Sequence, residues 1–197
     1  RLPAVLTPAD EQRTRAWMAS IGVGLLSLAQ LGCQPISANK GRITVASAGK
    51  ISSLDPAQAS TVNTIQLLSA LGDPLYSLDE RGELIPRLAA APPIVSPDGL
   101  TVTIPLRRDV LFHDGTRFDA EAMAFSLRRF LEIGTLSYVV GGRISSVDVA
   151  AVDRLVLRLS RPSTSLEGLL TSVNLTPVSP TAYTHYRDGF LHNRFVG

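Results

Sequence analysis

The stretch that most constrains the fold runs from residue 96 to residue 130 and reads SPDGLTVTIPLRRDVLFHDGTRFDAEAMAFSLRRF. Apolar and polar side chains alternate from Leu100 to Leu106, which predicts a strand with one buried face. Pro105 has no N–H to donate, so we expect that strand to lie at a sheet edge or to contain a bulge there. Residues 120–133 predict an amphipathic helix, because their larger apolar side chains gather on one face. A strand, a turn and a helix are therefore expected in direct succession.

The turn between that strand and that helix contains His113, Asp114 and Gly115, which could be read as a reactive cluster. A metal site generally needs three or four donors, and the other two histidines, His185 and His192, lie in a different segment. Turn chemistry accounts for the cluster, since Asp-Gly is a turn dipeptide whose glycine accepts a positive φ. We therefore expect scaffolding here, with no catalytic residue and no metal ligand.

Residues at both ends of the expected helix indicate where it begins and ends. Asp119 is a suitable N-cap, and Glu121 places a negative charge in the first turn, where it interacts favourably with the helix dipole. Gly134 is a suitable residue to follow the last turn. The helix should therefore begin just after Asp119 and end just before Gly134.

The remaining segments show no fixed-period repeat. Strands are expected at residues 42–48, 143–150 and 154–160, the last two as an antiparallel pair. Helices are expected at residues 61–71, 163–173 and 179–186. Residues 75–91 should form a hairpin around a turn at 79–82, followed by a short helical turn that ends at Pro92 and Pro93. Strands and helices do not alternate regularly, so the mix predicts an α+β fold rather than a doubly wound parallel sheet.

The N-terminal residues 1–33 have the order of a secretory signal peptide. Two arginines, Arg13 and Arg15, precede a short apolar stretch, and a small residue comes directly before Cys33. The apolar stretch is too short and too rich in Gly and Ser to indicate a membrane span. Residues 34–41 are polar with Pro and Gly and predict a linker. Cys33 in this position resembles the lipidated cysteine of a bacterial lipobox, although Gln30 stands where leucine is usual.

Charge and cysteine content exclude several classes of protein. Lys and Arg number 19 against 17 Asp and Glu, which gives no electrostatic footprint for nucleic acid. The single cysteine excludes an internal disulfide and any zinc site built from several cysteines. Hydrophobic residues make up 45% of the chain, which is ample for a packed core.

Four blocks, taken together and in order, resemble the extracytoplasmic solute-binding proteins of family 5. The blocks are SSLDPAQAS, GELIPRLA, the stretch from 96 to 130, and ISSVDVAAVDRLVLRLSRP. The third is the most specific, with a strand that ends in Leu-Arg, then Phe-His-Asp-Gly, then a helix with Phe-Ser near its middle. Members of this family serve ABC importers of oligopeptides, dipeptides, nickel complexes and related solutes, and the resemblance extends over residues 43–197.

The resemblance implies an α+β fold, namely the N-terminal part of a two-lobed, class II periplasmic-binding-protein fold. We expect a mixed sheet with antiparallel pairs and flanking helices. Residues 42–197 would form a partial N-terminal lobe, after the signal peptide of residues 1–33 and the linker of residues 34–41, and the second lobe would be absent.

The implied function is capture of a peptide or related small solute outside the cytoplasmic membrane and its delivery to the permease of an ABC importer. The resemblance implies no enzyme activity and no cofactor. The protein would be a monomer, periplasmic or on the cell surface, held to a bacterial membrane through a lipid on Cys33. Two alternatives stay open: a small secreted metal-dependent hydrolase that uses His113 and Asp114, and a non-functional truncated product.

In this family, the loop after the first strand faces the cleft between the lobes. That loop corresponds here to Ser52, Ser53, Leu54 and Asp55, which the resemblance implies as ligand-binding residues. Extended peptides can be held there through main-chain contacts, so side-chain identity says little about the solute.

Overall fold

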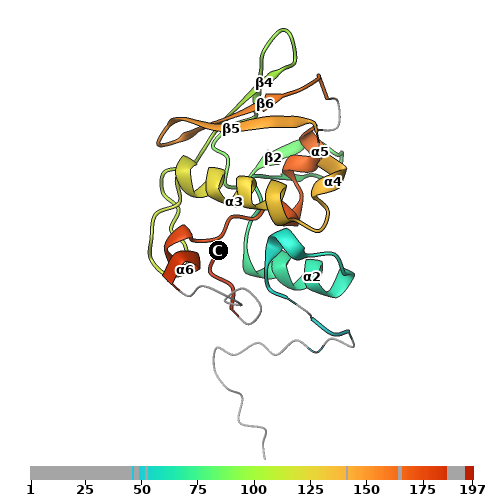
Figure 1. Cartoon of the computed structure of the whole chain (residues 1–197), viewed down its shortest axis with the longest axis vertical. Coiled ribbons are helices and arrows are strands. Elements are labelled where there is room, and N and C mark those ends of the chain that lie inside the picture. Colours follow the sequence, from blue (N-terminus) through green and yellow to red (C-terminus); the bar gives the residue numbers. More distant parts are fainter. Residues whose placement is uncertain (1–45, 47–48, 52, 141, 164–165, 186–193) are drawn as a thin grey trace, which may run out of the picture. The chain divides into compact units, whose positions relative to one another are not determined.

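The structure is a computed structural model that describes residues 46, 49–51, 53–140, 142–163, 166–185 and 194–197 (Figure 1). The chain divides into two compact units, Arg1–Ala46 and Ser47–Gly197. Only Ala46 of the first unit is described, so the fold given below is that of the second unit. The expected signal peptide, the linker and, apart from Ala46, the strand at 42–48 lie outside the described residues.

Helices and strands follow one another in an order that fits an α+β fold. The helical segments are η2 (Pro56–Gln58), α2 (Val62–Leu71), α3 (Ala120–Ile133), α4 (Ser137–Val140), α5 (Leu166–Leu170), η3 (Val173–Leu175) and α6 (Pro180–His185). The strands are β1 (Tyr76–Leu78), β2 (Leu84–Pro86), β3 (Ile94–Val95), β4 (Thr101–Pro105), β5 (Ile144–Ala151) and β6 (Arg154–Leu159). None of the helices in the described part of the chain has the length and apolar character of a membrane span.

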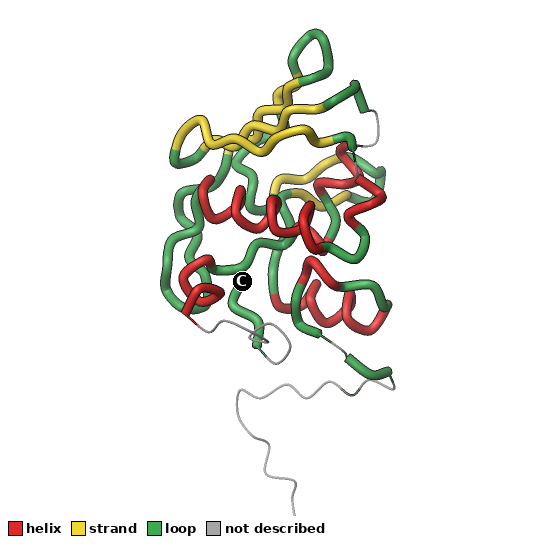
Figure 2. The backbone as a smooth tube through the Cα atoms, in the orientation of Figure 1, coloured by secondary structure: helices red, strands yellow, loops and turns green. Residues whose placement is uncertain are grey.

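The main sheet has four strands in the order β3-β4-β6-β5, and a separate hairpin pairs β1 with β2. Every pairing among the described strands is antiparallel. One face of the main sheet carries buried apolar side chains from β4 and β6, including Val102, Ile104, Leu155 and Leu157. Figure 2 shows α3 in the layer next to this sheet, and the two layers together enclose the core.

The expected helix at 120–133 is confirmed, and its ends lie where the capping residues indicate. The Oδ1 atom of Asp119 accepts a hydrogen bond from the Ala122 N–H at 2.9 Å, which satisfies one free donor of the first turn. At the other end, the Gly134 N–H donates to the Phe130 carbonyl at 2.9 Å. Met123 and Leu127 are fully buried against the sheet, and burial of such a side chain stabilises the fold by about 1.5–3 kcal/mol.

Pro105 was expected at a sheet edge or a bulge, and this prediction is wrong. β4 lies between β3 and β6, and its pairing with β6 runs regularly as far as Pro105 opposite Arg154. The proline is tolerated because β3 pairs only with Val102 and Thr103, so no ladder partner needs its N–H. The Pro105 carbonyl instead accepts a hydrogen bond from the Ala90 N–H at 2.9 Å.

The other sequence predictions that fall on described residues hold with two exceptions. The hairpin around residues 79–82, the helix at 61–71 and the β5–β6 pair are confirmed. The short helical turn before Pro92 is wrong, since Ala89 forms an isolated bridge with Leu106 instead. The helix expected at 163–173 is shorter, because Ser172 caps the separate turn η3 with its side-chain oxygen. Residues 164–165 lie outside the described residues.

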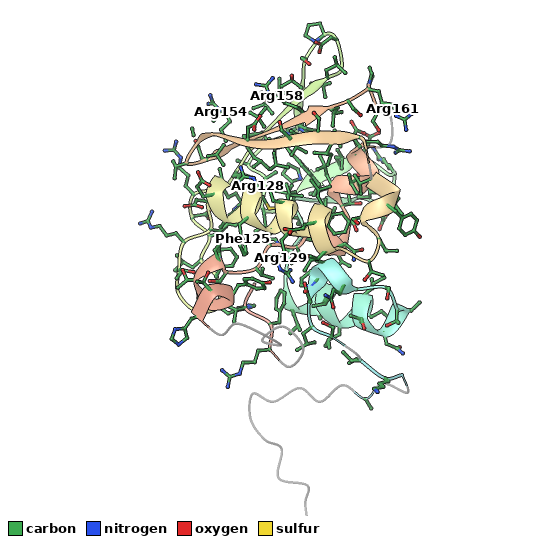
Figure 3. All side chains as sticks on the ribbon, in the orientation of Figure 1. Phe125, Arg128, Arg129, Arg154, Arg158 and Arg161 are labelled. Carbon is green, nitrogen blue, oxygen red and sulfur yellow. The ribbon has the colours of Figure 1, made fainter. Side chains whose placement is uncertain are left out.

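The free edge of β5 is partly covered by a side chain from α3. The Nε and Nη2 atoms of Arg128 donate to the Val147 carbonyl at 3.2 and 2.7 Å. In Figure 3, Arg128 lies on the side of α3 toward the sheet, whereas Phe125 and Arg129 lie on the opposite side. Arg128 therefore binds the sheet, whereas Arg129 faces away from it.

Candidate functional site

The predicted ligand-binding residues lie at the start of a segment that we call the Asp55 loop, residues 53–59. Ser53 and Asp55 are buried and Leu54 is partly exposed, while Ser52 lies outside the described residues. The Ser53 hydroxyl oxygen accepts a hydrogen bond from the Asp55 N–H at 3.0 Å. The Oδ1 atom of Asp55 accepts one from the Ala57 N–H at 3.0 Å and so caps η2.

The Asp55 carboxylate forms a buried, bidentate ion pair with Arg129 of α3, which is 74 residues further along the chain. Nη1 lies 2.8 Å from Oδ1, and Nη2 contacts Oδ2. The arginine and aspartate side chains are only 9% and 6% exposed. Charges removed from water in this way are tolerated when they pair in good geometry, so each side chain depends on the other.

The guanidinium of Arg129 has a second neighbour, Tyr183 of α6. Its carbon Cζ lies 4.6 Å from the centre of the tyrosine ring, in the range of a cation–π contact. Phe125 of α3 packs edge-on against the same ring, with centroids 5.4 Å apart. Burial acts to lower the pKa of Arg129, but the hydrogen bonds to Asp55 and the contact with Tyr183 outweigh it and raise that pKa.

Two further contacts fasten the Asp55 loop from other elements. The Asn174 side-chain amide donates to the carbonyls of Pro56 at 2.9 Å and Ala59 at 2.8 Å. The Thr135 N–H, just after α3, donates to the Ala57 carbonyl at 3.1 Å. By contrast, Leu54 makes no hydrogen bond to any other described residue. The loop is thus held on several sides, and the partly exposed Leu54 lies between the buried residues Ser53 and Asp55.

An open groove of about 690 Å³ is lined by residues of α3, of α6 and of the segment just before α3. Its lining combines aromatic side chains with charges of both signs. The lining residues are Thr116, Arg117, Asp119, Glu121, Ala122, Phe125, Arg128, Arg129, Glu132, Ile133, Pro180, Thr181 and Tyr183. Because positive and negative groups are mixed, the groove does not favour a ligand of one charge.

His113, Asp114 and Gly115 form the expected turn. Gly115 has φ of 80°, and Asp114 accepts hydrogen bonds from the Thr116 N–H at 2.9 Å and the Ser179 hydroxyl at 2.5 Å. Burial acts to raise the pKa of Asp114, but the hydrogen bonds from Ser179 and Thr116 outweigh it and lower that pKa. In the described ranges, no three acidic, histidine or cysteine side chains lie close enough together to hold a metal ion. The hydrogen bonds of Asp114 and the positive φ of Gly115 are those of a turn.

Sequence reasoning missed Arg129 and Asn174, which bond to the predicted loop. One signal was available for Arg129, because it follows the buried residues Ala122 and Ser126 at helical steps of four and three. A charged residue on a buried face of a helix indicates a partner. The sequence does not say which of the many carboxylates that partner is, nor does it bring Asn174 near Pro56.

Comparison with known families identifies the chain over more than half of its length. Residues 83–195 match the family model described as bacterial extracellular solute-binding proteins, family 5, middle region. The match includes the strand β4, the turn with Gly115, and the helix α3.

Curated relatives include the glutathione-binding protein GsiB of two bacteria. The protein from Pectobacterium atrosepticum is 30% identical over 176 residues, which cover 87% of this chain and 33% of the relative. The protein from Salmonella choleraesuis is 27% identical over 175 residues, which cover 88% and 33%. The chain thus spans about a third of the length of these relatives.

Solved structures show the same fold. OppA of Listeria monocytogenes bound to peptide superposes with a TM-score of 0.67 at 22% identity, over 72% of this chain and 31% of that one. NikZ from Campylobacter jejuni in complex with Ni(L-His) superposes with a TM-score of 0.61 at 25% identity, over 74% and 29%. The α+β fold predicted from the resemblance, part of a periplasmic-binding-protein architecture, is confirmed by these superpositions. With the family match, they establish that the chain belongs to the bacterial extracellular solute-binding proteins of family 5.

Proposed function

We propose that this chain is part of the solute-binding component of an ABC importer, which captures a peptide or related small solute outside the cytoplasmic membrane and delivers it to the permease. The observation that carries the proposal is the family match over residues 83–195. The relatives are named for glutathione binding, and the solved neighbours hold a peptide or a nickel–histidine complex. Each of these ligands contains at least one amino acid.

The proposed mechanism is capture without a covalent step. A second lobe closes on the solute, and the solute favours the closed state because it binds that state more tightly. The Asp55 loop contributes from this lobe. Its side chains Ser53 and Asp55 are turned inward and engaged, so contact with the solute comes through the main chain near Leu54. Such main-chain contact suits an extended peptide and depends little on the identity of the peptide's side chains.

The proposed location follows from the order of segments at the N-terminus. Residues 1–33 act as the export signal, and a lipid on Cys33 holds the protein to a bacterial membrane as a monomer. Mass spectrometry of the exported protein tests this: a diacylated Cys33 at the new N-terminus is the expected result, and an unmodified thiol contradicts it.

Solute binding is tested by calorimetry with the full product of the coding sequence from which this chain is read. The probes are glutathione, the nickel–histidine complex and the tetrapeptide Ser-Thr-Ser-Ala, which is bound in the solved structure of DppA from Helicobacter pylori. We expect at least one to bind with micromolar or tighter affinity, and the 197-residue chain alone to bind weakly or not at all, since only one face of the cleft is present. Absence of binding by the full product, or tight binding by the short chain, contradicts the proposal.

A further inference from the structure

We infer that Arg129 is a positioning residue for solute capture: it holds the Asp55 loop in the conformation that presents the Leu54 main chain. This inference rests on the proposed function, because it assigns a role to a residue behind the predicted binding loop. Arg129 is buried under that loop and contacts its carboxylate through both terminal nitrogens. It therefore acts on the solute through the loop and not by touching it.

The loop needs such support because its own structure is short. η2 contains only three residues, and a single 3₁₀ turn is not stable by itself. Its capping carboxylate, Asp55, is buried, so it needs a cation in place to remain there. Without Arg129, the uncompensated charge would favour a conformation in which Asp55 returns to water. That movement would shift the neighbouring Leu54 peptide group.

The surroundings of Arg129 fix the direction of its guanidinium. Tyr183 lies against one face of it, and Phe125 supports the tyrosine ring. A planar group held by a ring on one side and a carboxylate at its end has little rotational freedom. Lysine would keep the positive charge but lose the two parallel hydrogen bonds, so it should hold the loop less firmly.

The effect on affinity follows from the fraction of molecules whose loop is in the binding conformation. If replacement of Arg129 lowers that fraction to about one tenth, the apparent Kd rises about tenfold. Hydrogen exchange should report the same change directly at two amides. The Ala57 N–H is bonded to the Asp55 carboxylate and the Gln58 N–H to the Asp55 carbonyl, so both should lose protection.

The experiment compares Arg129→Met, Arg129→Lys and the matched control Arg154→Met. Arg154 lies exposed on the outer face of β6, and Figure 3 shows it on the far side of the sheet from Arg129. Calorimetry with the three probes is done on the full product, and amide exchange is measured on both the full product and this chain. The Leu159 amide, which is bonded to the Leu100 carbonyl of the main sheet, reports whether the core remains folded.

We expect Arg129→Met to weaken binding about tenfold or more, to raise exchange at Ala57 and Gln58, and to leave exchange at Leu159 unchanged. Arg129→Lys should fall between this variant and the wild type, and Arg154→Met should match the wild type. In the wild type, solute should also slow exchange at Leu54, and Arg129→Met should abolish that protection. A purely structural role would not change protection at Leu54 in a folded variant.

Two contrary results have different meanings. If the wild type binds solute and Arg129→Met binds it equally well, the inference is overturned while the proposed function stands. If the wild-type full product binds none of the probes, the proposed function itself fails. Should Arg129→Met not fold, Arg129→Lys decides the matter, because wild-type affinity and wild-type exchange in that variant would contradict the inference.

Discussion

Asp55 and Arg129 behave as a unit because neither charge is stable alone in its surroundings. The two side chains are almost fully buried and bonded through two pairs of atoms. Removing water from both charges costs several kcal/mol per ion in a protein, and this cost is offset only while both partners are present. Removal of either residue alone should therefore destabilise the fold, because it leaves the other charge buried without a partner.

Asp55→Ala should lower the free energy of unfolding by about 3–5 kcal/mol, since it leaves the Arg129 guanidinium buried without its partner. The double variant Asp55→Ala with Arg129→Met should lose less than the single variant, because no unpaired charge remains. Urea denaturation of all four forms of this chain measures both values. A double variant that loses the sum of the two single losses would show that the two residues are independent.

Asp114 should make stability depend on acid. Its pKa in the folded chain lies below the ordinary value, because the hydrogen bonds from Ser179 and Thr116 outweigh the effect of burial. A carboxylate of this kind contributes stability above its unfolded pKa, near 3.9, and loses it as the pH falls through the lower folded pKa. Wild type should therefore exceed Asp114→Asn in urea midpoint at pH 7, and the difference should shrink below about pH 4. A difference that is the same at both pH values would exclude this role.

At the scale of elements, the outermost strand β5 is protected by its neighbouring helix. An unpaired strand edge offers a template for pairing with another chain, and native proteins cover such edges with charged side chains. Arg128 of α3 does this by donating twice to the Val147 carbonyl. The same helix thus packs on the sheet, holds the Asp55 loop and covers an edge, using residues on three of its sides.

Arg128→Ala should increase self-association, because it frees the Val147 carbonyl and removes a positive charge from the edge. Sedimentation of this chain over a range of concentrations measures the change, with Arg154→Ala as a control for the loss of charge. Equal sedimentation of Arg128→Ala and the control would mean that the edge is protected in another way.

At the scale of the whole molecule, features that depend on neighbouring residues were predictable and those that depend on distant ones were not. The limits of α3 were predictable from its flanking residues Asp119 and Gly134. The turn between β5 and β6 was likewise predictable from residues that are adjacent to it in the sequence. The position of β4 was not predictable from Pro105, because the partner strand β3 has only two residues and leaves no sequence pattern. The predicted site loop was located through the family resemblance, but its partner Arg129 could not be identified without the fold.

The contacts that fix the Asp55 loop join residues that are far apart in sequence, and this separation has a consequence for synthesis. Pro56 and Asn174 are 118 positions apart, so at about 20 residues per second the ribosome adds Asn174 about 6 s after Pro56. Through that interval the nascent segment has neither its amide partner nor, at first, its guanidinium partner. It should therefore reach its final place only after Asn174 has been translated.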